Sequence, residues 1–115
     1  MSLLKLADGR NFEYEDNGVT SDQAILFLHG TPSADKLWSQ WLPQVTGCLA
    51  IATSRAGYGK SDRHKGRTVA DDLADQQALL DHFHIKEFVS IGWSGGGPHS
   101  INMTRDPRRK GALTL

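Results

Sequence analysis

The sequence has little of several features that would point to particular classes of protein. It holds one cysteine in 115 residues, Cys48, so no internal disulfide can form and a disulfide-based scaffold is excluded. Thirteen basic and thirteen acidic residues give a net charge of zero, which leaves no electrostatic footprint for nucleic acid. No apolar run reaches membrane-spanning length, and the one near the N-terminus is too short for a signal peptide. These absences favour the reducing cytoplasm and predict neither nucleic acid nor a membrane as a partner.

Metal ligands and cofactor motifs are missing as well. No cluster of cysteine, histidine and acidic residues has metal-ligand spacing, so we predict no metal and no cofactor. The paired acids Asp71 and Asp72 fall in the first turn of an expected helix, where the helix dipole stabilises them. Capping and solubility therefore account for this pair without acid-base chemistry.

What the sequence does have is a serine set among glycines. Residues 87–98 read EFVSIGWSGGGP, with Gly92 and Gly96 two positions on either side of Ser94. A buried-type strand followed at once by a helix start would place Ser94 on a tight turn that only small residues permit. Such a turn exposes the serine hydroxyl as a nucleophile. It also aims the backbone amide of Gly95 at the oxygen that becomes negative during acyl transfer.

A second motif supplies a partner for that amide. Residues 24–34 read AILFLHGTPSA, a buried-type strand that ends in His29, and Gly30 then lets the chain swing over the end of the sheet. We expect the amide of Thr31 to be the second oxyanion donor. For His29 we favour a side-chain hydrogen bond that shapes this loop, because loop polar residues are most often used in that way.

A third segment completes an ordered set. Residues 54–62, SRAGYGKSD, follow an expected strand over 48–53. The three segments together resemble the α/β-hydrolase family, whose members commonly carry an HGxP loop, an RxGxGxS loop and a GxSxG elbow in this order. The resemblance covers nearly the whole chain and departs from the family at Ser54 and Ala56, where many relatives have an acid and a proline. Serine at position 94 argues against the haloalkane and epoxide branches, which would call for aspartate.

The resemblance also implies catalytic partners that this chain does not supply. Family triads run serine, acid, histidine, with the last two contributed by later strands, whereas these residues stop soon after the elbow. We therefore expect residues 1–115 to be the N-terminal part of an incomplete domain. The local histidines are poor substitutes, because His99 points elsewhere on its helix, His82 and His84 precede the elbow strand, and Asp106 is too distant. His64 lies on the correct side of the sheet and stays open as a base.

The remaining elements predict an α/β fold with a mainly parallel sheet and an N-terminal hairpin turning at Asp8-Gly9. A helix is expected over 68–83, capped by Thr68, and a short one over 36–45, with Trp38, Trp41 and Leu42 as its apolar stripe. We interpret the basic cluster at residues 105–110 as a solvated helix exit. The last strand, 111–115, would be an open apolar edge suited to self-association or to a missing C-terminal half.

The sequence thus predicts a serine hydrolase that cleaves an ester, thioester or similar acyl bond of a small molecule through an acyl-enzyme on Ser94. Perhydrolase or cofactorless peroxidase chemistry uses similar elbows and remains open. Two other hypotheses compete. A catalytically inactive module would fold and associate without serine reactivity. A dinucleotide-binding domain would use Gly92, Ser94 and Gly97 as a glycine-rich loop, but the serine crowds the pyrophosphate and no acid follows about 20 residues later.

Overall fold

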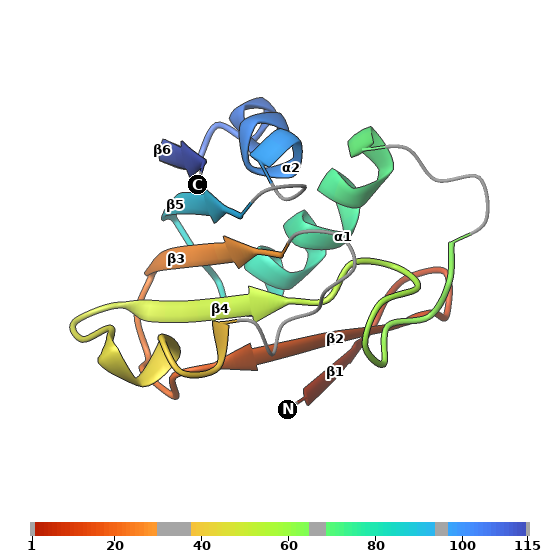
Figure 1. The fold of residues 1–115 in the computed structure, drawn as a ribbon, viewed down its shortest axis with the longest axis horizontal. Coiled ribbons are helices and arrows are strands. Elements are labelled where there is room, and N and C mark those ends of the chain that lie inside the picture. The colour runs from red at the N-terminus through yellow and green to blue at the C-terminus, as the bar shows by residue number, and fades with distance from the viewer. Residues whose placement is uncertain (1, 30–37, 65–68, 94–96, 115) are drawn as a thin grey trace.

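The computed structural model, shown in Figure 1, describes residues 2–29, 38–64, 69–93 and 97–114. Within these ranges the strands form one six-stranded sheet in the order β1-β2-β4-β3-β5-β6. The strand bounds are β1 Ser2–Lys5, β2 Asn11–Asp16, β3 Gln23–Leu28, β4 Leu49–Thr53, β5 Glu87–Gly92 and β6 Arg109–Thr114. β4, β3, β5 and β6 are parallel neighbours, while β1 and β2 pair antiparallel. The predicted α/β class and mainly parallel sheet are confirmed.

The N-terminal hairpin forms as predicted. β1 and β2 are joined by a turn in which the amide of Leu6 donates to the carbonyl of Arg10 at 2.8 Å. Gly9 has a φ of +90°, a conformation that favours glycine. Because β2 also pairs with β4, the hairpin continues the sheet instead of standing apart from it.

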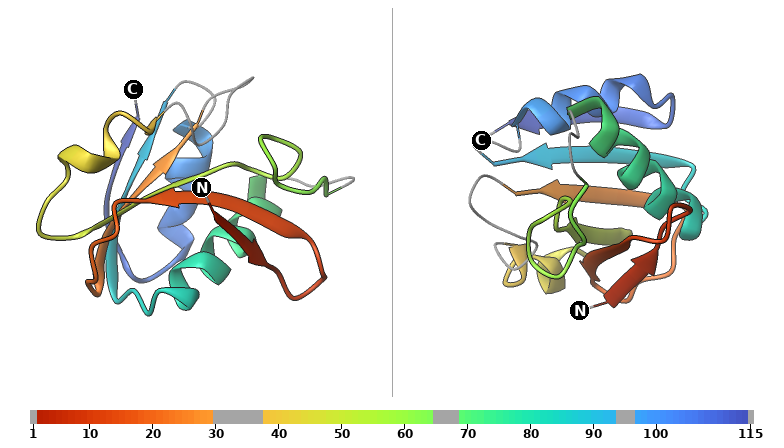
Figure 2. Two further views of the ribbon diagram at one scale, coloured as in Figure 1. Left: turned by 90° about the horizontal axis from the view of Figure 1, so that it is seen from below. Right: turned by 90° about the vertical axis from the view of Figure 1, so that its right-hand side faces the viewer.

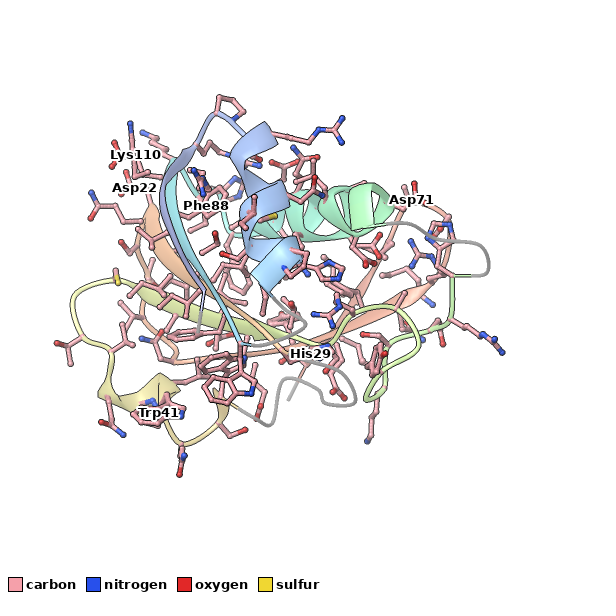
Figure 3. The ribbon with its side chains drawn as sticks, turned by 45° about the horizontal axis from the view of Figure 1, so that its top comes forward. Asp22, His29, Trp41, Asp71, Phe88 and Lys110 are labelled. Atoms are coloured by element: carbon pink, nitrogen blue, oxygen red, sulfur yellow. The ribbon has the colours of Figure 1, made fainter. Side chains whose placement is uncertain are left out.

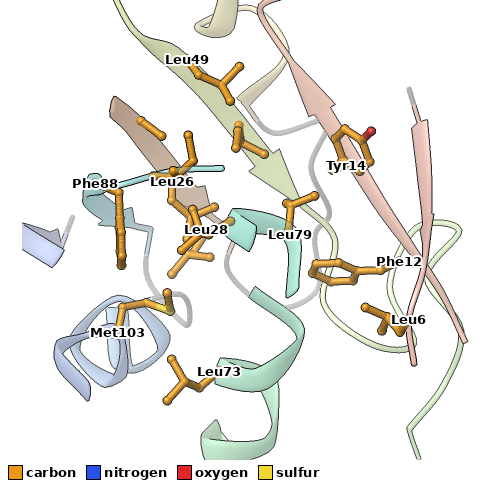
Figure 4. Packing of buried hydrophobic residues seen from close by; sticks show 14 residues of the cluster. Leu6, Phe12, Tyr14, Leu26, Leu28, Leu49, Leu73, Leu79, Phe88 and Met103 are labelled. Atoms are coloured by element: carbon orange, nitrogen blue, oxygen red, sulfur yellow. The ribbon is translucent and has the colours of Figure 1, made fainter. Parts of the chain in front are cut away.

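Two helices cover one face of the sheet: α1 Val69–His82 and α2 Gly97–Asn102 (Figure 2). Side chains on a strand alternate between the two faces, so Leu26 and Leu28 of β3 point toward these helices. There they join the core cluster of Figure 4, which includes Leu79 of α1 and Met103 just after α2. The helix predicted over 68–83 is confirmed, whereas Thr68 lies outside the described residues and its capping role stays a prediction.

The opposite face of β3 carries Phe27, which packs against a short tryptophan-bearing segment. The rings of Phe27 and Trp38 lie 5.0 Å apart, and Leu42 belongs to the same buried cluster. The helix predicted over 36–45 was wrong for its described part, which has turns and a 3₁₀ helix, η2, over Leu42–Gln44. Pro43 cannot donate a helical hydrogen bond, which explains the break. Trp41 is consequently 49% exposed and does not join the predicted stripe.

One edge of the sheet is formed by β6, which starts at Arg109, two residues before the predicted position. On the neighbouring β5, Phe88 and Ser90 face α2 and the core, while Val89 on the other face is 36% exposed. Trp93, just beyond the strand, is 48% exposed. Parallel sheets are ordinarily covered on both faces, so this exposed face of β5 departs from the usual arrangement.

Among the described helices, none is long and apolar enough to cross a lipid bilayer.

The end of α2 is held by an ion pair between the buried Asp106 and the partly buried Arg108. Arg105 and Lys110 are exposed, in agreement with the predicted solvated helix exit, whereas Arg108 departs from it. After the 3₁₀ helix η4, Met103–Arg105, the chain reaches Asp106, which is 2% exposed. Its carboxylate accepts from the side chain and the main-chain amide of Arg108, both at 2.9 Å, and from Gln77 of α1 at 3.2 Å. The hydrogen bonds from the Arg108 side chain lower the pKa of Asp106 to about 2, against the opposing effect of burial.

This ion pair should make stability depend on pH at the acid end. Because the folded pKa of Asp106 is lower than its unfolded value, its contribution is present above pH 4 and is lost as pH falls toward 2. Asp106→Asn is expected to lower the free energy of unfolding at pH 7 by about 2 kcal/mol and to flatten this acid limb. Urea denaturation at pH 7 and pH 3 measures both.

Asp81→Asn is the matched control for this prediction. Asp81 accepts from the same Arg108 at 2.7 Å, but its side chain is 71% exposed. An exposed pair contributes less than about 1 kcal/mol, so the acid limb should be nearly unchanged. Equal effects of the two substitutions would contradict a special role for the buried carboxylate.

Candidate active site

The carboxyl ends of the parallel strands meet at one edge of the sheet. Leu28 of β3 is level with Thr53 of β4 on one side and with Gly92 of β5 on the other. The residues that come next, such as His29 and Ser54, therefore leave the sheet side by side; His29 is labelled in Figure 3. Open α/β sheets bind ligands at this edge. We take it as the candidate site.

The frame of the predicted elbow is present at this edge. β5 ends at Gly92, the amide of Trp93 donates to the carbonyl of Leu28 at 3.1 Å, and α2 begins at Gly97. A strand thus precedes the position of Ser94 and a helix follows it, which is the order of elements that the elbow prediction requires. Several predicted site residues lie outside the described residues, so their geometry stays a prediction: Gly30, Thr31, Ser94, Gly95 and Gly96.

His29 is fully buried at the end of β3 and contacts the loop that follows β4. Its Nε2 accepts a hydrogen bond from the main-chain amide of Arg55 at 3.0 Å. An accepting Nε2 means that the ring is neutral and carries its proton on Nδ1. The Arg55 guanidinium donates to the His29 carbonyl, and the Tyr58 ring meets the imidazole at a 5.0 Å centroid distance. The lone pair that a base would use is thus occupied in holding the loop.

The loop over residues 54–62 is anchored by a buried carboxylate on β2. Glu13 is 2% exposed and accepts from the Ser54 hydroxyl at 2.9 Å and from the Lys60 amide at 3.1 Å. Its own amide donates to the Ser61 hydroxyl at 2.8 Å, and its carbonyl accepts from the Ser54 amide at 3.0 Å. Both ends of the loop are thereby tied to one residue of the neighbouring strand.

This anchor gives a physical account of one departure from the family pattern. The family resemblance predicts an acid at this position in many relatives, whereas here Ser54 itself binds a carboxylate, that of Glu13 on the neighbouring strand. Sequence reasoning missed Glu13, because a glutamate in a hairpin strand suggests the solvent side. Only the pairing of Tyr14 in β2 with Thr53 in β4 brings it beneath the loop. The second departure, Ala56, is buried at 2% exposure.

Asp72 has a role that capping and solubility do not explain. It is 2% exposed, and its Oδ2 lies 3.5 Å from Nδ1 of His99 on α2. The His99 side chain thus points toward α1. Its distance from Ser94 stays a prediction, because Ser94 lies outside the described residues. Nearby, Gln76 of α1 donates to the Thr53 hydroxyl at 3.0 Å, which fixes α1 against the end of β4.

The other histidines lie away from this edge or in a separate hollow. His82 ends α1 and His84 lies in the connection that leads into β5, so both precede the start of that strand, as predicted. His64 lines a hollow between the hairpin and α1 together with acidic residues such as Asp71, and it is half-buried. Among the residues that the structure describes, no group of histidine, cysteine and acidic side chains could hold a metal ion.

Comparison with known proteins places this arrangement in a family. Residues 23–110, which span β3 to the start of β6, match the family described as the alpha/beta hydrolase fold. The chain belongs to the α/β-hydrolase family. A non-heme haloperoxidase of Rhodococcus erythropolis is 34% identical over 100 residues, covering 84% of this chain and 36% of that protein. The uncharacterized hydrolase YcgS of Bacillus subtilis is 32% identical over 112 residues, covering 94% of this chain and 38% of that protein.

Solved structures of this family agree with the fold. Est816, titled as an N-acyl homoserine lactone degrading enzyme, superposes with a TM-score of 0.83 at 26% identity. The match covers 96% of this α/β-hydrolase chain but 43% of Est816. This α/β-hydrolase chain therefore spans less than half the length of these relatives.

Proposed function

We propose that this α/β-hydrolase chain carries the nucleophile and oxyanion donors of a serine hydrolase acting on small-molecule esters, thioesters or similar acyl bonds. The observation that carries the proposal is the frame around Ser94. β5 ends at Gly92 and α2 begins at Gly97, at the sheet edge where His29 leaves β3. Est816, a lactone-degrading enzyme by its title, has the same fold, and a lactone is a cyclic ester.

The chemistry follows from the groups proposed. The Ser94 hydroxyl loses its proton to a base and forms a bond to the carbonyl carbon, while the carbonyl oxygen becomes negative. The amides of Thr31 and Gly95 donate hydrogen bonds to that oxygen. Collapse of the tetrahedral intermediate expels the protonated leaving group and leaves an acyl-enzyme, which water cleaves to the free acid.

The base and the acid of the triad are proposed to come from polypeptide outside these 115 residues. The matched relatives are more than twice as long, and the described part of this chain offers surfaces for further polypeptide. β6 is an edge strand, and Val89 and Trp93 are exposed apolar side chains on or next to β5. A further strand beside β6 would complete the sheet. The single cysteine, Cys48, is half-buried before β4, which suits the proposed cytoplasmic setting.

A related reaction is kept as a second candidate because of one comparison. The relative from Rhodococcus erythropolis is named a non-heme haloperoxidase. If hydrogen peroxide replaced water as the acceptor, the acyl-enzyme would yield a peracid and free Ser94. Adding peroxide during ester turnover and measuring peracid against free acid separates the two candidates.

Labelling by a fluorophosphonate tests the nucleophile. The product of the entire reading frame should bind one equivalent, whereas Ser94→Ala should bind none. Ser2→Ala, which alters an exposed serine on β1, is the control and should label as the wild type does. Persistent labelling of Ser94→Ala would refute the assignment of Ser94. No labelling of folded wild type would favour the inactive module, and family membership leaves the dinucleotide hypothesis without support.

A further inference from the structure

We propose that Arg55 is a positioning residue that holds His29, and through it the segment that begins with Gly30, in register with the site. This inference rests on the proposed function, since that segment is where the second oxyanion donor is expected. Arg55 contacts His29 at two separate points. Its main-chain amide donates to Nε2 at 3.0 Å, and its guanidinium donates to the His29 carbonyl.

The two contacts act on different parts of His29. The bond to Nε2 fixes the orientation of the ring, and the bond to the carbonyl fixes the peptide plane that leads into Gly30. Two fixed points on one residue leave little freedom for rotation about its backbone. A single donor could hold the ring or the peptide, but not both.

Arg55 is itself held firmly enough to act as a reference. It is 2% exposed, and its guanidinium lies 5.7 Å from the centre of the Tyr58 ring, within cation–π range. The Tyr58 amide donates back to the Arg55 carbonyl at 2.9 Å, which closes a tight turn. The preceding residue, Ser54, is bound to Glu13 through its side chain and its amide. Hydrogen bonds between Glu13 and Ser54, and between Arg55 and His29, thereby connect β2 to His29.

Burying an arginine is unfavourable unless its charge does specific work or is well compensated. A hydrophobic residue at position 55 would pack against Tyr58 without that cost. It would, however, leave the His29 carbonyl without its guanidinium donor. The geometry thus indicates that the N–H donors of the Arg55 guanidinium, and not the size of the side chain, are what position His29.

The tautomer of His29 gives a readout that is independent of activity. Nε2 accepts in this structure, so the proton belongs on Nδ1, and which nitrogen is protonated is set by the hydrogen bond of the other. If Arg55→Met lets His29 shift, that bond weakens and the Nε2–H form gains population. Imidazole ¹⁵N chemical shifts distinguish the two forms.

The second readout separates positioning from binding. Displacing a catalytic group by about 1 Å can cost a hundredfold in rate. For Arg55→Met we therefore expect kinact for a fluorophosphonate to fall by about tenfold to a hundredfold, with KI changed by less than about threefold. Arg55→Lys keeps the charge but lacks the planar fork, so it should recover only part of the loss. Arg63→Met removes an exposed arginine nearby and should alter neither readout.

The outcomes are decisive for each part of the proposal. A folded Arg55→Met that keeps the wild-type ¹⁵N pattern, or that keeps the wild-type kinact, overturns it. If Arg55→Met does not fold, the ¹⁵N pattern and the kinact of Arg55→Lys decide in its place. An Nε2–H tautomer of His29 in the wild type overturns the proposal by itself. Failure of the wild type to label would reject the proposed function only. In that case the tautomer of the variants still decides whether Arg55 positions His29.

Discussion

Ser54→Asp is expected to lower the free energy of unfolding by about 3 to 5 kcal/mol, as for a buried charge without a partner. The Ser54 hydroxyl lies 2.9 Å from Oε1 of Glu13, and both residues are almost fully buried. A second carboxyl group at that distance repels the first, and two such groups cannot both ionise at little cost. Urea denaturation followed by circular dichroism measures the loss.

The double variant Glu13→Ser, Ser54→Asp should recover much of this loss. It moves the one carboxylate from the strand to the loop. The Lys60 amide donates to Glu13 at 3.1 Å. In the double variant, the carboxylate of the new aspartate at position 54 would accept this hydrogen bond instead. We expect the two substitutions to couple by about 2 kcal/mol, within the range found for residues in one hydrogen-bond network.

Ser54→Asn is the matched control, because asparagine has nearly the shape of aspartate without its charge and can donate to Glu13. Because it adds volume at a fully buried position, it should cost about 1 to 3 kcal/mol from overpacking, which is less than the loss expected for Ser54→Asp. If Ser54→Asn were as damaging as Ser54→Asp, side-chain size and not charge would explain the effect. Additive effects in the double variant would likewise reject the exchange of one carboxylate for the other.

Gly59→Ala is expected to cost about 2 to 5 kcal/mol, from backbone strain and from overpacking together. Gly59 has a φ of +53°, and a Cβ there would overlap Oε1 of Glu13 and lie 2.8 Å from Oγ of Ser54. The glutamate cannot swing aside freely, since it would give up its bonds to Ser54 and the Lys60 amide. The glycine is thus needed for space as well as for conformation.

Gly57→Ala separates these two causes. Gly57 also has a positive φ, +84°, but the nearest atom to its Cβ would be Cγ of Arg63 at 3.8 Å. Only the strain of the left-handed region remains, about 1 to 2 kcal/mol. The difference between the two alanine variants, measured by denaturant midpoints, reports the contact with Glu13. Equal losses would mean that the crowding at Gly59 relaxes without cost.

These predictions concern residues that hold the candidate site in place. Those residues are far apart in the sequence. Glu13 lies in β2, His29 follows β3 and Arg55 follows β4, yet they form one connected set at the carboxyl edge of the sheet. Groups preorganised in this way need little rearrangement during a reaction. The hydrogen bonds among these three residues would then be in place before the proposed nucleophile reacts.

Much of the fold could be predicted from the local pattern. The apolar runs in 24–28 and 49–53 are largely buried strands, as expected for parallel strands that are covered on both faces, whereas 87–92 forms a strand with one face partly exposed. The 3.6-residue spacing of Leu73 and Leu80 predicts α1. The same reasoning failed over 36–45, where Pro43 breaks the helical hydrogen bonds that the spacing of tryptophans suggested.

What the sequence by itself determined is the set of glycine-bearing segments, the elements between them and the family to which the chain belongs, since these depend on neighbours a few residues apart. The tertiary structure alone decided that the Glu13 carboxylate binds Ser54, that Asp72 lies against His99, and that the buried Asp106 pairs with Arg108. Burial of a charged side chain is a property of what covers it. The covering segments here are distant in sequence and are brought together only when the strands pair.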